Sequence, residues 1–103
     1  GAAVNQATTE NGVFPLYAAA TRGHAEVVRL LVRSGAAANQ ASDAGITSLY
    51  VAALQGHTEV VRLLIGHGAA VNQAKTNDGV TPLLIATCNG QTEVVRLLIS
   101  SGA

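Results

Sequence analysis

The segment "TEVVRLLI" occupies residues 58–65 and recurs letter for letter at residues 92–99, and a variant, "AEVVRLLV", occupies residues 25–32. In each copy the apolar residues return every three or four positions, which is the period of an amphipathic α-helix. We therefore predict a helix in each of the three copies.

The apolar stripe of this helix is wider than a surface helix needs. In the middle copy, Val60, Leu63 and Leu64 follow the helical spacing, and Val61 and Ile65 broaden the stripe on either side. Such a face requires a neighbour on two sides. On the opposite side, acidic and basic residues one turn apart are expected to pair in solvent, as Glu26 with Arg29, Glu59 with Arg62 and Glu93 with Arg96.

The whole chain repeats, and glycine marks the period. "GAAVNQA" begins at Gly1, "GAAANQA" at Gly35 and "GAAVNQA" again at Gly68, and a last "GA" begins at Gly102. These positions are 34, 33 and 34 residues apart, which predicts one domain of three units, approximately 1–34, 35–67 and 68–101. The odd residue falls between "NQA" and the next glycine, so we expect a loop there.

A second, shorter helix is predicted in each unit, within "FPLYAAATR", "TSLYVAALQ" and "TPLLIATCN". Thr47 and Thr81 are placed to cap the second and third of these helices, and Pro82 suits a first helical position, whereas Phe14 cannot cap. Glycines follow as left-handed caps at Gly23, Gly56 and Gly90. Small residues at Ala19, Ala52 and Ala86 are expected to let these helices approach one another, so that the array curves with the longer helices on its convex side.

This order of motifs resembles the ankyrin repeat, over essentially the whole chain. The matching positions are Gly79, Thr81, Pro82 and Leu83, then Gly23, His24, Gly56 and His57, then Gly68, Ala69, Val71 and Asn72. The resemblance implies an all-α repeat solenoid of helix-turn-helix pairs joined by β-hairpin-like loops. It also implies a non-catalytic protein–protein interaction module.

Several positions depart from the family pattern. Tyr17, Tyr50 and Leu84 stand where the family has histidine, Ser48 replaces proline, Gln91 replaces histidine, and Ala3, Ala37 and Ala70 replace aspartate. A naturally drifted array and an engineered ankyrin scaffold without a natural partner both fit these departures.

In a stacked array, loop tips and inner helices form an extended concave surface that can be fitted to a partner. We predict that the partner contacts residues that vary between the units: Thr9, Glu10, Asn11, Val13, Thr21, Arg22, Asp43, Ala44, Ile46, Leu54, Gln55, Thr76, Asn77, Asp78, Val80, Cys88 and Asn89. Exposed Ile46 and Leu54 beside Tyr50 could supply an apolar anchor, although burial of Tyr50 between repeats is the favoured interpretation.

Composition argues against other functions. Six basic and six acidic residues give no net charge, which disfavours nucleic-acid binding. One cysteine, Cys88, allows no internal disulfide, and we predict an intracellular, cytoplasmic protein without a membrane span. Cys88 with His24 or His57 lacks a third catalytic group, and His24, His57 and His67 lack metal-ligand spacing, so no activity, cofactor or metal is predicted.

Two further hypotheses follow from the repeats. The chain has no methionine, which is expected of an excerpt or a trimmed chain, and no polar terminal repeat, so its ends could stack head to tail into an open array. By the family resemblance, Asn39 and Asn72 stand where an asparaginyl hydroxylase can act, although this residue ordinarily ties down a turn.

Overall fold

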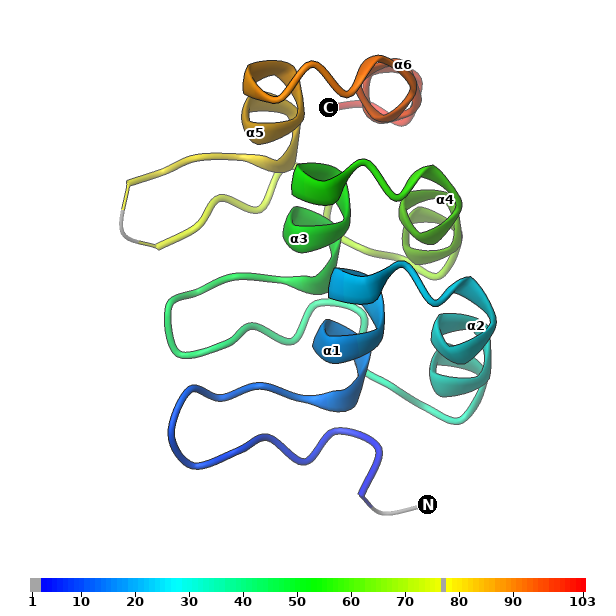
Figure 1. The fold of residues 1–103 in the computed structure, drawn as a ribbon, viewed down its shortest axis with the longest axis vertical. Coiled ribbons are helices and arrows are strands. Elements are labelled where there is room, and N and C mark those ends of the chain that lie inside the picture. Colours follow the sequence, from blue (N-terminus) through cyan, green and yellow to red (C-terminus); the bar gives the residue numbers. More distant parts are fainter. Residues whose placement is uncertain (1–2, 77) are drawn as a thin grey trace.

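A computed structural model describes residues 3–76 and 78–103 of the chain. In these residues the chain forms three helix pairs stacked in sequence order (Figure 1). The helices are α1 (Pro15–Arg22), α2 (Ala25–Arg33), α3 (Ser48–Gln55), α4 (Thr58–Gly66), α5 (Pro82–Cys88) and α6 (Thr92–Ser100). The described residues contain no β-strand beyond an isolated antiparallel bridge between Ala41 and Thr47. The predicted all-α repeat solenoid is confirmed.

The stack has three layers, which Figure 1 shows side by side: the loops, an inner row of α1, α3 and α5, and an outer row of α2, α4 and α6. Ala19, Ala52 and Ala86 are buried in the inner row, as predicted. Because these side chains are small, the inner helices contact one another more closely than the outer helices do.

The starts of the inner helices follow the predicted chemistry. The hydroxyl of Thr47 accepts a hydrogen bond from the Tyr50 N–H, and that of Thr81 accepts one from the Leu84 N–H, both at 3.2 Å. Phe14 holds the same position before α1 and caps nothing. Its ring is buried instead and packs edge to face against Tyr17, with ring centroids 5.7 Å apart.

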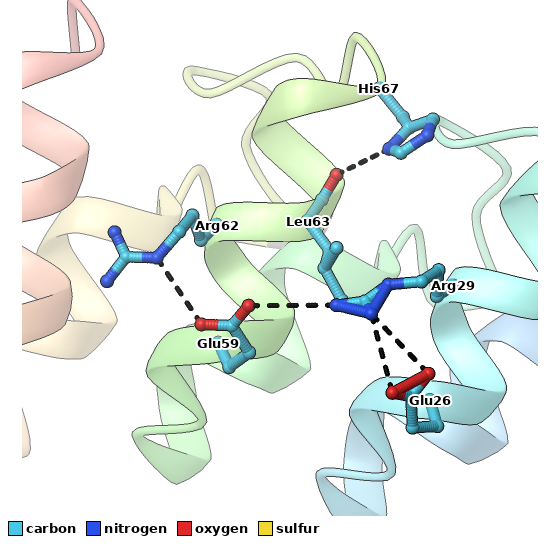
Figure 2. A network of polar contacts seen from close by, with 6 residues as sticks. All are labelled: Glu26, Arg29, Glu59, Arg62, Leu63 and His67. Atoms are coloured by element: carbon cyan, nitrogen blue, oxygen red, sulfur yellow. Dashed lines mark hydrogen bonds and ion pairs between the residues drawn. The ribbon is translucent and has the colours of Figure 1, made fainter.

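The outer helices bury a wide apolar stripe. Val60, Val61 and Leu64 of α4 are fully buried, and Leu63 and Ile65 are half-buried at its edges. The predicted ion pairs form on the solvent side of each outer helix, at 3.3 to 3.4 Å. Figure 2 shows a contact that the sequence did not predict, in which Arg29 Nη2 of one unit lies 4.0 Å from Glu59 Oε2 of the next.

The three loops are hairpin-like. Each is closed by a backbone hydrogen bond, from Thr8 to Val13, from Ser42 to Ile46 and from Lys75 to Val80. The second loop is one residue shorter than the other two. The one-residue difference in length between the units therefore lies in this loop, as predicted.

The favoured interpretation, burial of Tyr50, is confirmed, and the alternative of an exposed apolar anchor is wrong. Tyr50 is buried, and Ile46 and Leu54 are half-buried, with Ile46 packed against the core. Lys75 of the next unit covers the Tyr50 ring, with Nζ 5.8 Å from its centroid. Comparison of the units one by one therefore did not reveal that a residue of the next unit covers Tyr50.

Candidate interaction surface

The loops form a continuous row because neighbouring loops are hydrogen-bonded to each other. The Asp43 N–H donates to the Asn11 carbonyl at 3.1 Å, and the Thr76 hydroxyl donates to the Ala44 carbonyl at 2.9 Å. The first contact is between backbone atoms only, and the second uses the side chain of Thr76 alone. The side chains of Asn11 and Asp43 consequently remain exposed in a row whose spacing is fixed.

The ends of the inner helices form a second row. Asn89 Nδ2 and Gln91 Nε2 both donate to the Leu54 carbonyl, at 3.0 and 3.1 Å. One unit earlier, His57 Nε2 lies 3.1 Å from the Thr21 carbonyl. Gln91 therefore makes the contact that histidine makes in the preceding unit, which explains why this replacement is accommodated.

The predicted binding residues divide into these two rows. Along the chain an inner helix lies between the two rows, and an eight-residue helix is about 12 Å long. The loop row contains Thr9, Glu10, Asn11, Val13, Asp43, Ala44, Ile46, Thr76, Asp78 and Val80, and the helix-end row contains Thr21, Arg22, Leu54, Gln55, Cys88 and Asn89. Asn77 lies outside the described residues.

Exposure differs among these residues. The exposed ones are Thr9, Glu10, Asn11, Arg22, Asp43, Gln55, Thr76, Asp78, Cys88 and Asn89, and the half-buried ones are Val13, Thr21, Ala44, Ile46, Leu54 and Val80. The half-buried set includes the position after each loop glycine, where Ile46 and Val80 pack against the core. Thr76 and Asn89 are exposed but use their side chains to join neighbouring units.

The third loop carries its own charge pair. Asp78 Oδ1 accepts a hydrogen bond from the Val80 N–H at 3.2 Å, and Asp78 Oδ2 lies 3.2 Å from Lys75 Nζ. The backbone hydrogen bond from Val80, followed by Lys75, lowers the pKa of the Asp78 carboxyl below its ordinary value. Its charge is thereby kept at the loop tip, where Glu10 and Asp43 add exposed carboxylates in the other two loops.

These joined loops and paired helices agree with the comparison against known families. A family model described as "Ankyrin repeats (3 copies)" matches residues 1–73 and, in a second match, residues 16–103. The chain belongs to the ankyrin repeat family. Ankyrin repeats are generally protein–protein interaction modules, and the family is generally non-catalytic. A search of curated proteins found none that matches the chain.

The asparagine that closes the "GAAVN" or "GAAAN" segment joins neighbouring ankyrin units at two of its three positions, Asn5 and Asn39. Asn5 Oδ1 accepts a hydrogen bond from the Ala37 N–H at 2.8 Å, and Asn39 Oδ1 accepts one from the Ala70 N–H at 2.7 Å. Asn72 makes no corresponding side-chain bond within residues 3–76 and 78–103. The ordinary role of tying down a turn thus holds for Asn39, whereas hydroxylation of either residue stays a prediction.

The remaining residues considered for catalysis or metal binding do not come together in one site. Cys88 is exposed on α5, and the His57 ring contacts the Thr21 carbonyl. His67 Nδ1 lies 2.9 Å from the Leu63 carbonyl on the outer face (Figure 2). In the part of the chain that the structure describes, no three His, Cys, Asp or Glu side chains group as metal ligands, and no helix could cross a lipid bilayer.

Proposed function

We propose that this ankyrin repeat chain is a non-catalytic module that binds a partner protein through the loop row and the helix-end row. The observation that supports the proposal is a contrast between two sets of side chains, those that recur in every unit and those that differ between units. Side chains that recur in every unit form its helices and core, whereas the exposed side chains of the two rows differ from unit to unit. The backbone contacts and the recurring side chains fix the spacing of the loops and helix ends. The remaining exposed side chains can therefore vary to recognise a partner.

The exposed side chains indicate what kind of partner fits. Glu10, Asp43 and Asp78 place a carboxylate in each loop, and Arg22 and Gln55 end the first two inner helices. Because these groups are polar and exposed, they favour a partner that donates hydrogen bonds and positive charge to the loop row. Such rim charges set association rate and specificity more than total affinity.

Affinity capture with matched variants tests this function. The immobilised chain is compared with a variant carrying Glu10→Ala, Arg22→Ala, Asp43→Ala and Gln55→Ala, all at exposed side chains. The control carries Arg33→Ala and Arg62→Ala on the outer helices, which are also exposed. We expect the same proteins to be captured by the original chain and the control but lost from the first variant. Loss on the control alone would place binding on the outer helices and refute the assignment.

A further inference from the structure

Two asparagines of this chain are followed directly by glycine, in the pairs Asn11-Gly12 and Asn89-Gly90. In such a pair the backbone nitrogen of glycine can attack the side-chain amide of asparagine. Glycine favours this reaction because it has no side chain to hinder the approach and lets the backbone bend freely. The other asparagines precede glutamine or aspartate. The two pairs are therefore the places where the chain can modify itself.

The reaction needs water but no oxidant or reductant. At the first pair, the Gly12 nitrogen forms a bond to the side-chain carbonyl carbon of Asn11, Cγ, and the bond from Cγ to Nδ2 breaks. The proton of the Gly12 N–H leaves with that nitrogen as ammonia, and a cyclic imide remains. Water then opens the ring. Opening at Cγ gives aspartate, and opening at the backbone carbonyl carbon gives isoaspartate, in which the chain runs through the side chain.

The attacking nitrogens of the two pairs have the same hydrogen bonding. The Gly12 N–H donates to the Thr8 carbonyl and the Gly90 N–H donates to the Thr87 carbonyl, both at 3.1 Å. Both glycines also have a φ of +68°. Neither the hydrogen bond nor the backbone conformation of the glycine therefore distinguishes the two pairs.

The asparagine side chains, in contrast, are held differently. Asn89 Nδ2 donates to the Leu54 carbonyl of the preceding unit at 3.0 Å, and the Asn89 N–H donates to the Ile85 carbonyl in α5 at 3.1 Å. The Asn11 side chain is exposed and makes no hydrogen bond within residues 3–76 and 78–103. Asn11 can thus turn toward the Gly12 nitrogen without losing a side-chain contact, whereas Asn89 must first leave the neighbouring unit.

The first loop also requires the glycine of its pair. Gly12 has a positive φ and is buried against Asp43 of the next loop, and a Cβ at this position would collide with Asp43. Any other residue would strain the backbone there. The reactive pair is therefore a consequence of the conformation that closes the loop.

The third loop shows that this position accepts a carboxylate. Asp78 precedes its loop glycine as Asn11 does, is exposed, and lies 3.2 Å from Lys75 Nζ. In the first loop Thr8 stands in the place of Lys75, and its hydroxyl accepts a hydrogen bond from the Val13 N–H at 3.2 Å. A carboxylate formed from Asn11 would therefore have no cation in its own loop to pair with.

We propose that Asn11 is a self-modification site, at which the folded chain converts asparagine to aspartate and isoaspartate, and that its contact with Leu54 protects Asn89. Conversion adds one negative charge to the loop row, where Glu10 and Asp43 already expose carboxylates. An effect of this charge on partner binding rests on the proposed function, whereas the reaction itself does not.

The selectivity is measured by incubating the chain in mildly alkaline buffer, which promotes loss of the glycine N–H proton. Peptide mapping by mass spectrometry follows both asparagines, and circular dichroism verifies the fold. We expect Asn11 to convert about tenfold faster than Asn89, because Asn89 must break a hydrogen bond to react. In urea, which unfolds the chain, neither side chain is held and the two rates should become similar.

Matched variants assign the product. The modified chain carries one more negative charge, so anion-exchange chromatography separates it from the original. Asn11→Gln should prevent its formation, because the larger ring that glutamine requires forms much more slowly. Asn89→Gln is the control and should leave it unchanged. Asn11→Asp should elute with the aspartate product.

Two results would overturn the proposal. Equal rates at Asn11 and Asn89 in the folded chain would mean that the contact with Leu54 gives no protection. Absence of conversion at Asn11 in the folded chain, whatever happens in urea, would mean that the loop backbone prevents the reaction. No partner is needed for either measurement, so this proposal and the proposed function can fail separately.

Discussion

Ser48 occupies the first position of α3, where α1 and α5 begin with Pro15 and Pro82. Its side chain is fully buried, and its hydroxyl has no hydrogen-bond partner within the described residues. Thr47, before it, has an extended backbone, with φ −91° and ψ 166°, which is the conformation that a following proline requires. The site is thus prepared for the proline that the family pattern places there.

We predict that Ser48→Pro raises the free energy of unfolding by about 1 kcal/mol, because it removes an unpaired buried hydroxyl and restricts the unfolded chain. Urea denaturation followed by circular dichroism measures the change. Ser48→Ala removes the hydroxyl alone and should give part of the gain. A loss of stability in Ser48→Pro would show that the ring does not fit between the neighbouring units.

Gly56 ends α3 with φ +77°, and the side chain of Gln91 from the next unit lies against its Cα. A Cβ at this position would both strain the backbone and collide with Gln91. We predict that Gly56→Ala lowers the free energy of unfolding by about 2 kcal/mol. Gly66, in α4, has open space around it and no positive φ, so Gly66→Ala should be neutral or stabilising by up to about 1 kcal/mol. Equal effects at the two glycines in thermal unfolding would contradict this reasoning.

At the scale of the element, the inner helices depend on their N-terminal caps. Thr81 caps α5, whose seven residues are too few to be stable without tertiary contacts. We predict that Thr81→Ala costs about 1 kcal/mol and speeds hydrogen exchange at the Leu84 amide, which loses its acceptor. Thr92→Ala, at an exposed threonine in the first turn of α6, is the matched control and should change neither quantity appreciably.

The third loop should respond to acid. Because the pKa of Asp78 is lowered in the folded chain, ionised Asp78 contributes stability above the carboxyl's unfolded pKa, and this contribution is lost as the pH falls through the folded value. We predict that the protection of the Val80 amide against exchange falls as the pH drops through the lowered pKa of the Asp78 carboxyl, where this carboxyl becomes protonated. Hydrogen exchange read by NMR measures the effect. Asp78→Asn should remove most of the pH dependence, and an unchanged profile in that variant would assign it to another group.

At the scale of the whole molecule, each unit uses its neighbours as part of its core. Leu64 of the middle unit is fully buried, whereas Leu31, at the same position in the first unit, is half-buried. We predict that Leu64→Ala lowers the free energy of unfolding by about 3 kcal/mol and Leu31→Ala by roughly half as much, since cavity cost follows burial. Chemical denaturation of both variants measures the difference. Equal costs would mean that each unit is stable by itself.

Much of this architecture was predictable from the sequence because it depends on local chemistry. Helical periodicity, the threonine caps at Thr47 and Thr81, and the loop that absorbs the change in repeat length are properties of short segments. Exposure of many of the predicted binding residues was also predictable, since polar loop tips seldom become buried. The half-burial of Ile46 and Leu54 was not predictable in this way, because it depends on tertiary packing: Ile46 packs against the core, and Asn89 and Gln91 of the next unit hydrogen-bond to the Leu54 carbonyl.

The sequence by itself determined the repeat, its helices and its family. The tertiary structure alone decided which copies of a repeated residue are buried. Val27 and Val60 each follow a glutamate in nearly identical helices, yet Val27 is 44% exposed and Val60 is 1% exposed. The physical reason is that each of these side chains is covered by residues of a neighbouring unit, about 33 residues away in the sequence. The local sequence therefore does not tell which copy is buried.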